Sequence, residues 1–230
     1  VSGPHGRIGP TLKKYPEIVF AEGKFDENGL TLLPIQTQAG YIVSASKAST
    51  DFGQQWTVFD GITGAEQDLR MWRPYAYNGG TTQLYNTGTG LYDSTAITAA
   101  GEQVAQLDTN TEQGEWISVK MPKSIKLKHF NIFTQFNSLG NLVSSGHLYA
   151  KNASNDSWVK IHSFSGATTT SVEFPTIHHV NSTTPYKYFA LIVTKSAGQP
   201  TIGEWELYGY EEDPPAGDHS VDTTFKSRFN

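Results

Sequence analysis

Short runs of alternating apolar and polar residues recur along most of this chain and predict β-strands. The first two runs are Tyr15–Phe20 and Gly40–Ser46. Two more lie at Trp116–Lys120, which Pro122 is expected to close, and at Ile125–Gln135. Within the last run the apolar positions move from one face to the other, which predicts a β-bulge or burial on both sides.

The second half of the chain continues the same rhythm. Two β-forming runs, Gly146–Ala150 and Trp158–Phe164, flank a polar segment and predict a hairpin with a longer loop. The near-continuous apolar run Tyr188–Val193 predicts a central strand, and Ile202–Tyr210 predicts a last one. The best helical candidate is a single turn at Trp56–Phe59. The pattern therefore predicts an all-β protein.

Two regions interrupt this pattern. Residues 73–113 are rich in Gly, Thr, Asn and Tyr, and an irregular stretch of this length is usually functional or disordered. Residues 211–230 begin as an acidic, proline-rich linker, which is expected to lead into a truncated further module. We predict an N-terminal extension with one strand over 1–39 and one β domain over 40–210.

Composition narrows the classes of function. The 37% of hydrophobic residues is enough for a core, while the net charge of −5 leaves no basic footprint for nucleic acid. The chain has no cysteine, which excludes disulfides, cysteine-based zinc sites and thiol nucleophiles. No apolar run approaches the ~20 residues of a membrane-spanning helix, so no membrane insertion is expected.

Several short motifs stand in an order that resembles a known family. They are Ser44–Ser46, Val58–Gly61, Trp72, Trp116–Val119, Ser154–Trp158 and Glu206–Gly209. This order resembles the discoidin or coagulation-factor C-type domain, and the family 32 carbohydrate-binding modules of the same galactose-binding-like fold. The resemblance covers about residues 40–210 and implies a jelly-roll β-sandwich. The long 73–113 segment and Ser157, where the family often has Gly, depart from the pattern.

The resemblance also implies a structural Ca²⁺ ion on the turn Asp60–Gly64, closed by a glutamate of the final strand. We predict Asp60, Thr63 and Glu206 as side-chain ligands, because Ca²⁺ takes several oxygen ligands and a glycine-containing turn exposes its carbonyls. The alternative is an ordinary Asp-Gly turn beside a surface glutamate.

In this fold, three loops converge at one end and are implied to hold the ligand. The predicted ligand-binding residues are Trp56, Arg73, Tyr75, Tyr77, Asn78, Phe136 and Asn137. Together they offer aromatic planes for the apolar face of a sugar ring and planar amide or guanidinium groups for its hydroxyls. A second set of aromatic residues falls within strand patterns and is expected to pack in the core or the hairpin: Trp116, Trp158, Phe164, Phe189 and Trp205.

Two other functions stay open. Glu204 and Glu206 lie two apart on a predicted strand and share a face, so they form the best candidate pair for a glycoside hydrolase or lyase. A protein- or lipid-binding discoidin domain would extend apolar loop tips, for which Phe52 and Leu139 are the only obvious candidates. No nucleophile elbow, phosphate-binding loop or zinc-protease motif occurs.

The favoured hypothesis is a non-catalytic carbohydrate-binding module that attaches an extracellular or virion-surface protein to a cell-surface glycan or polysaccharide. Any homo-oligomer would form through the larger parent protein. The virion part rests on a weaker resemblance of three terminal segments to surface (fibre) proteins of marine viruses and phages. These segments are residues 3–6, 12–20 and 217–224.

Overall fold

The computed structural model describes residues 11–21, 35–47, 54–63, 70–74, 84–101, 103–107, 112–133, 142–165, 174–180 and 182–211. Its strands are β1 (Lys13–Tyr15), β2 (Ile35–Gln38), β3 (Tyr41–Ala45), β4 (Glu115–Phe133), β5 (Val143–Lys151), β6 (Val159–Ser165), β7 (Thr176–His179), β8 (Tyr186–Ser196) and β9 (Glu204–Glu211). The described helices are the 3₁₀ turn η1 (Gln55–Phe59) and α1 (Ser94–Ala99). The all-β prediction is confirmed. Neither helix has the length and apolar character needed to cross a membrane.

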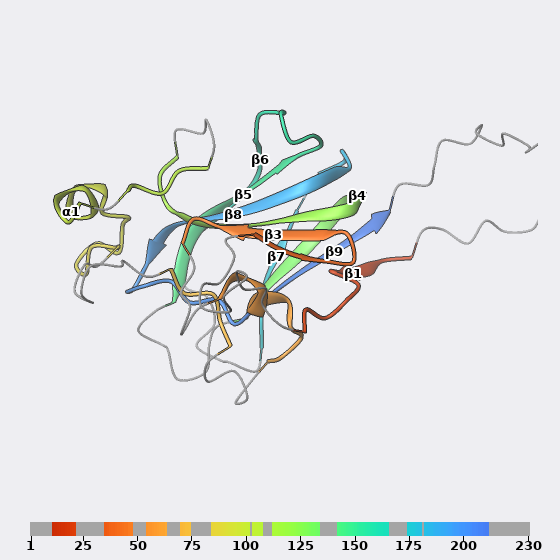
Figure 1. The fold of residues 1–230 in the computed structure, drawn as a ribbon, viewed down its shortest axis with the longest axis horizontal. Helices are drawn as coiled ribbons and strands as arrows, with labels where there is room; N and C mark the ends of the chain where they lie inside the picture. Colours follow the sequence, from red (N-terminus) through yellow and green to blue (C-terminus); the bar gives the residue numbers. More distant parts are fainter. Residues whose placement is uncertain are drawn as a thin grey trace, which may run out of the picture.

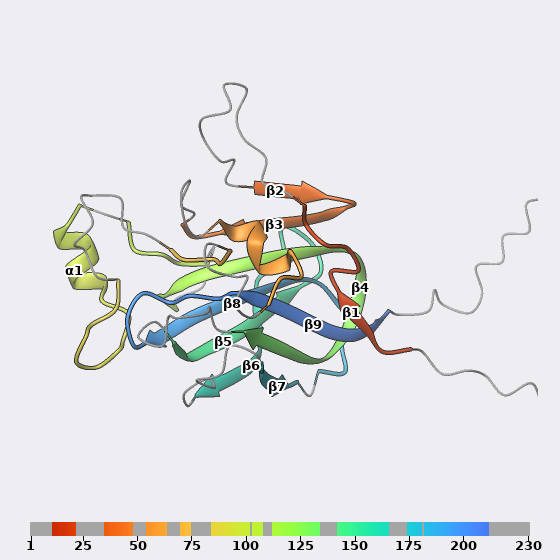
Figure 2. The same ribbon diagram turned by 90° about the horizontal axis from the view of Figure 1, so that it is seen from below.

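The strands form two layers that share β4 (Figures 1 and 2). The first half of β4 pairs with β3 and β8, and its second half pairs with β9 and β7. One sheet therefore runs β2-β3-β4-β8-β5-β6, and the other runs β1-β9-β4-β7. Because β4 passes from one sheet to the other, it starts and ends at the same end of the β-sandwich.

Pro122 lies inside β4, so the prediction that it closes the strand is wrong. The register of β4 against β8 shifts between Lys120 and Ile125, which is where the strand leaves one sheet for the other. An exposed proline is tolerated there because its missing N–H breaks no central ladder. The predicted bulge is confirmed as a register shift between Leu127 and His129.

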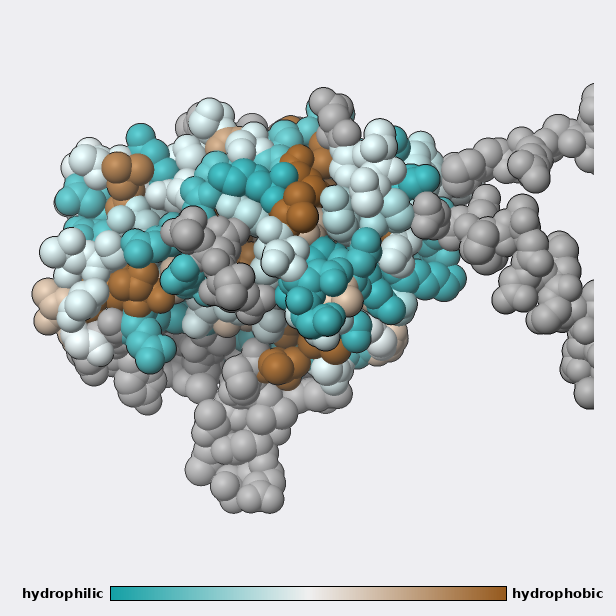
Figure 3. Space-filling view, turned by 90° about the horizontal axis from the view of Figure 1, so that it is seen from above, coloured by the Kyte–Doolittle hydropathy of each residue, from teal (hydrophilic) through white to brown (hydrophobic). Residues whose placement is uncertain are grey.

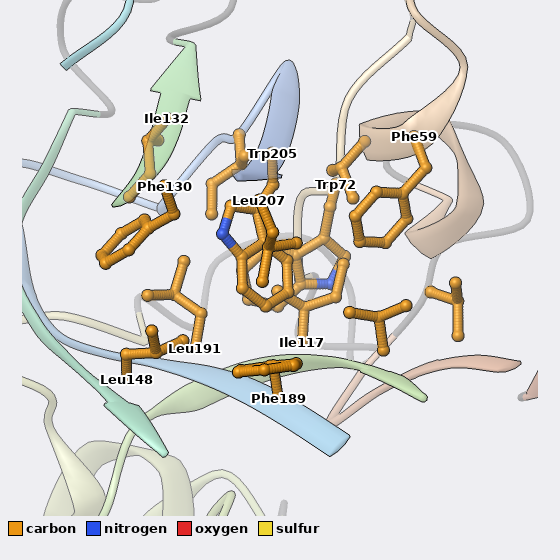
Figure 4. Packing of buried hydrophobic residues seen from close by; sticks show 14 of the residues in the cluster. Phe59, Trp72, Ile117, Phe130, Ile132, Leu148, Phe189, Leu191, Trp205 and Leu207 are labelled. Carbon is orange, nitrogen blue, oxygen red and sulfur yellow. The ribbon is translucent and has the colours of Figure 1, made fainter. Parts of the chain in front are cut away.

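The core lies between the two sheets and is dominated by large aromatic side chains (Figure 4). Trp205 and Leu207 point inward from β9, opposite Phe189 of β8. The ring of Phe59, at the end of η1, lies 5.7 Å from that of Trp205, centroid to centroid. A buried Trp or Phe of this kind typically contributes ~3–5 kcal/mol. This packing fixes η1 against the first residues of β9.

The described part of the 73–113 region packs onto the sandwich. Asp93 caps α1 by accepting a hydrogen bond from the N–H of Ala96 at 2.9 Å. Leu84, Tyr85 and Ile97 are buried, and the hydroxyl of Tyr85 donates to the carbonyl of Val193 at 2.8 Å. Residues 84–101 are therefore a structured addition to the domain.

The described residues before position 40 contribute two strands, where the sequence pattern predicts one. β1 pairs with β9, and β2 pairs with β3. Within the predicted run Tyr15–Phe20 only Tyr15 is in a strand, but both Tyr15 and Phe20 are buried, and the N–H of Phe20 donates to the carbonyl of Phe59 at 3.0 Å. The described residues before position 40 thus belong to the sandwich, while the domain boundaries as such stay a prediction.

Candidate functional site

The segments that flank the predicted binding loops meet at one end of the sandwich. The indole N–H of Trp72 donates to the carbonyl of Lys47 at 3.0 Å, and Trp72 forms an isolated β-bridge with Ile202. Gly203 in turn donates its N–H to the carbonyl of Phe133, the last residue of β4. These contacts join the base of the loop after β3, the loop after Trp72 and the loop after β4. The convergence expected from the sequence is present at these loop bases.

Arg73 and Gln199, whose side chains each end in a planar polar group, are hydrogen-bonded to each other at this end. The Nε of Arg73 donates to the Oε1 of Gln199 at 2.8 Å, and both side chains are half-buried. The remaining guanidinium N–H groups of Arg73 point from a fixed plane, which suits hydrogen bonding to neighbouring hydroxyls. The sequence predicts Arg73 but misses Gln199, because a glutamine in a turn carries no periodic signal.

Trp56 does not present its ring to a ligand. It lies in η1 with 8% of its surface exposed, and its indole N–H donates to the side chain of Gln54. This burial does not fit a sugar-stacking role and makes Trp56 part of the core. The other predicted ligand-binding residues lie outside the described residues: Tyr75, Tyr77, Asn78, Phe136 and Asn137.

The turn after η1 buries the carboxylate of Asp60 beside the core. Its Oδ1 accepts the N–H of Ile62 at 2.9 Å, and its Oδ2 lies 3.2 Å from the Nη1 of Arg70. Burial raises the pKa of this carboxyl above its ordinary value, although these two donors oppose the shift. The side chain of Arg70 is 46% exposed, so its positive charge is shared with solvent.

Glu204 brings a second buried carboxylate to the same turn. Its Oε2 accepts the N–H of Gly61 at 3.3 Å, and 3% of the residue is exposed. Gly61 has a φ of 71°, a left-handed conformation that favours glycine. Burial, and next the charge of Asp60, raise the pKa of the Glu204 carboxyl to about 9. Burial and the neighbouring charge of Asp60 therefore both favour the protonated form of Glu204.

The predicted ligands Glu206 and Thr63 are not part of this arrangement. The Oε1 of Glu206 pairs with the Nζ of Lys14 at 3.2 Å, and its Oε2 accepts from Asn131 and from Tyr208. Thr63 is exposed. The structure therefore places Glu204 beside Asp60 in the position predicted for Glu206.

The donor set at this turn suits a hard cation held partly by the backbone. Among the described residues, no group of three or more His, Asp or Glu side chains is arranged to hold a metal ion. Asp60 and Glu204 would thus supply two carboxylates, and carbonyl oxygens of the turn would supply the rest. Ca²⁺ accepts such mixed oxygen ligands.

Both Glu204 and Glu206 line a hollow of about 380 Å³ between the 13–19 segment and β9. This gives the hydrolase alternative a geometric basis. However, both oxygens of Glu206 already accept hydrogen bonds from protein donors. A general base or nucleophile must be able to reach water or sugar, and in this structure the Glu206 oxygens are engaged by Lys14, Asn131 and Tyr208.

Comparisons with known proteins identify the fold. No protein-family model matches the chain in sequence, and no curated protein does. The chain is similar to the solved structure of a family 32 carbohydrate-binding module of a Clostridium perfringens family 89 glycoside hydrolase, in complex with GalNAc-β-1,3-galactose. The identity is 12% and the TM-score is 0.50, over 75% of this chain and 98% of that one.

Two further solved modules match over similar lengths. The family 32 module of C. perfringens NanJ, in complex with galactose, has 13% identity and a TM-score of 0.49, over 76% of this chain and 98% of that one. A chitosan-binding module of a Paenibacillus chitosanase/glucanase has 15% identity and a TM-score of 0.44, over 74% of this chain and 96% of that one. The match at a TM-score of 0.50 carries the structural conclusion: this chain has the galactose-binding-like β-sandwich fold of the family 32 modules.

Proposed function

We propose that this chain is a non-catalytic carbohydrate-binding module whose ligand site lies at the loop end of the sandwich. The observation that carries the proposal is the Arg73–Gln199 pair at the shared base of the converging loops. A guanidinium and an amide, each a planar group, can bind adjacent sugar hydroxyls, and the predicted aromatic residues would add stacking surfaces. The known complex of the similarly folded C. perfringens module with GalNAc-β-1,3-galactose supports this class of ligand.

A glycan array tests this proposal. We expect the wild type to bind a defined set of glycans. The affinity should fall at least about tenfold in R73A, which removes a charged donor, and in Y75A, which removes a stacking surface. R73K tests the need for a planar guanidinium, because lysine keeps the charge without the fork. K123Q, at the β4 bend on the opposite end of the sandwich, is the control. Unchanged binding by both R73A and Y75A would contradict the proposed site.

The same array separates binding from hydrolysis. Bound glycans are recovered and analysed for cleavage products, with and without Ca²⁺. The binding proposal predicts intact glycans, whereas products that disappear in E204Q and E206Q would favour the hydrolase alternative.

The attachment role on an extracellular or virion-surface protein belongs to the same proposal, and capture of intact cells through the array-identified glycan tests it.

We also propose that Asp60 and Glu204 hold a structural Ca²⁺ ion. The support is the buried carboxylate of Asp60 on a glycine-containing turn together with that of Glu204, which accepts a hydrogen bond from Gly61 of this turn. When bound, the ion would neutralise both carboxylates and stabilise the contact between η1 and β9, because a ligand that binds only the folded state adds stability. We expect EDTA to lower the melting temperature and added Ca²⁺ to restore it. An unchanged melt would contradict the site.

A further inference from the structure

The outer face of the first sheet carries a row of alternating lysine and aromatic side chains. Cross-strand register places Lys120 of β4 opposite Tyr188 of β8, and Tyr188 opposite Lys151 of β5. The Nζ atoms of Lys120 and Lys151 lie 5.7 and 5.9 Å from the centre of the Tyr188 ring. Lys151 also lies 4.6 Å from the ring of Trp158, just before β6. We call Lys120, Tyr188, Lys151 and Trp158 the lysine–aromatic row.

The row is a preformed surface. Its three backbone positions on adjacent strands span about 10 Å, since neighbouring strands lie about 4.8 Å apart. Lys120, Tyr188 and Trp158 are half-buried, while Lys151 is 6% exposed and donates to the carbonyl of Ser154 at 2.9 Å. Figure 3 looks onto this side of the molecule, where hydrophilic residues are spread widely and hydrophobic ones form separate patches. A cation fixed beneath aromatic rings attracts an anion more strongly than a fully solvated one, because water screens it less.

The charges one strand away from the row are paired, whereas Lys120 has no described carboxylate beside it. One strand away, Glu112 pairs with Lys160 at 2.7 Å and with His147 at 2.9 Å. Among the described residues, no carboxylate lies within ion-pair distance of Lys120, whose described contact is with the Tyr188 ring. Lys120 thus carries a positive charge that no described carboxylate balances, on a chain whose net charge is −5.

We propose that the lysine–aromatic row binds an anionic saccharide, one that carries uronate or sulfate groups. The apolar face of the sugar ring packs on Tyr188 and Trp158, and the anionic group pairs with Lys120, reinforced by Lys151. That the ligand is a saccharide rests on the proposed function. The new inference is that an anionic saccharide binds on a surface distinct from the loop end. Nucleic acid is disfavoured, because two lysines supply few phosphate contacts on an acidic protein.

Calorimetric titration of the whole chain with a short oligogalacturonate tests the row, with a neutral galacto-oligosaccharide of equal length beside it. K120Q is expected to weaken oligogalacturonate binding at least about fivefold, as loss of one charge-assisted contact requires. Y188L removes the aromatic surface while keeping an apolar side chain, and is expected to lose at least as much. The matched control is K128Q, because Lys128 lies 5.9 Å from the Tyr210 ring on the other sheet in the same kind of pair. K128Q is expected to bind as the wild type does.

Equal affinities of K120Q and the wild type for oligogalacturonate would overturn the proposed binding at the row. A loss of affinity in K128Q as large as that in K120Q would overturn it too. Single-stranded DNA that binds as tightly as oligogalacturonate would overturn it as well, because the attraction would then be for any polyanion. If neutral glycans bind in an Arg73-dependent way and oligogalacturonate does not bind, only the row is wrong. If oligogalacturonate binding depends on Lys120 while no glycan depends on Arg73, the row stands and the loop-end site fails.

Discussion

The loop end and the outer face of the second sheet hold the same residue, glutamate, in opposite environments. At the loop end, Glu204 is buried beside another carboxylate and accepts one backbone N–H. On the outer face, Glu206 is held by an ammonium, an amide and a hydroxyl. The difference teaches that sharing one face of a strand does not define a glutamate's role: both oxygens of Glu206 accept hydrogen bonds from protein side chains, whereas burial beside Asp60 raises the pKa of the Glu204 carboxyl.

The largest effect that sharpens this comparison is the response to Ca²⁺. At a free Ca²⁺ concentration about 100 times its Kd, the wild type should gain about 2.7 kcal/mol of stability. E204Q should lose most of this gain because it removes a proposed ligand, whereas E206Q should keep it. Thermal melts with and without Ca²⁺ measure the gain. Equal gains in E204Q and the wild type would break the assignment of Glu204.

A smaller effect is expected from E206Q without any metal. This substitution removes the charge that pairs with Lys14 and accepts from Asn131 and Tyr208, so it should cost about 1–2 kcal/mol. Urea denaturation in EDTA measures the cost. E204Q is the matched variant and should cost less at neutral pH, where the wild-type carboxyl keeps its proton. A larger cost for E204Q than for E206Q would reverse the comparison.

The smallest effect belongs to a third glutamate of β9, Glu211. Hydrogen bonds from Lys123 and Lys13 lower the pKa of this carboxyl from 4.5 to about 2. Its folded-state pKa lies below the unfolded one, so its contribution to stability is present above about pH 4.5 and is lost as the pH falls toward 2. The side chains of Lys13 and Lys123 are 42% and 70% exposed. Solvent therefore limits the contribution of the Glu211 carboxylate to stability to about 1 kcal/mol or less.

Denaturation of E211Q and the wild type between pH 6 and pH 2.5 tests this contribution. The two proteins should differ slightly at pH 6 and converge at the acidic end, because the wild-type carboxyl then carries a proton as well. A difference that grows as the pH falls would show that the ion pairs of Glu211 do not stabilise the fold.

Alternation of apolar and polar residues is enough to predict most strands of this fold. The β5–β6 hairpin and the bulge in β4 follow from it, and a near-continuous apolar run predicts the central strand β8. The passage of β4 through Pro122 does not, because proline commonly ends a strand and only packing of the two sheets shows that the chain bends there instead. The two strands before residue 40 are short, and partners far away in sequence define them.

The arrangement of the candidate site residues could be predicted only in part. Glu204 and Glu206 have the same parity on a strand, so a pattern cannot tell which one reaches Asp60. That choice depends on where β9 begins, which the contact between Gly203 and Phe133 determines. Trp56 was misplaced because a single 3₁₀ turn has no periodicity to show which side is buried. The lysine–aromatic row depends on the register of separate strands, and no local motif encodes it.

The long strand β4 has a consequence for how the domain opens. Its halves lie in different sheets, and each half is flanked by partner strands on both sides. Neither layer can detach while β4 stays hydrogen-bonded, so partial opening that frees one sheet is not available. Apart from the bend between Lys120 and Ile125, the amide protons of β4 should therefore exchange with solvent only through global unfolding, and they report the stability of the whole sandwich.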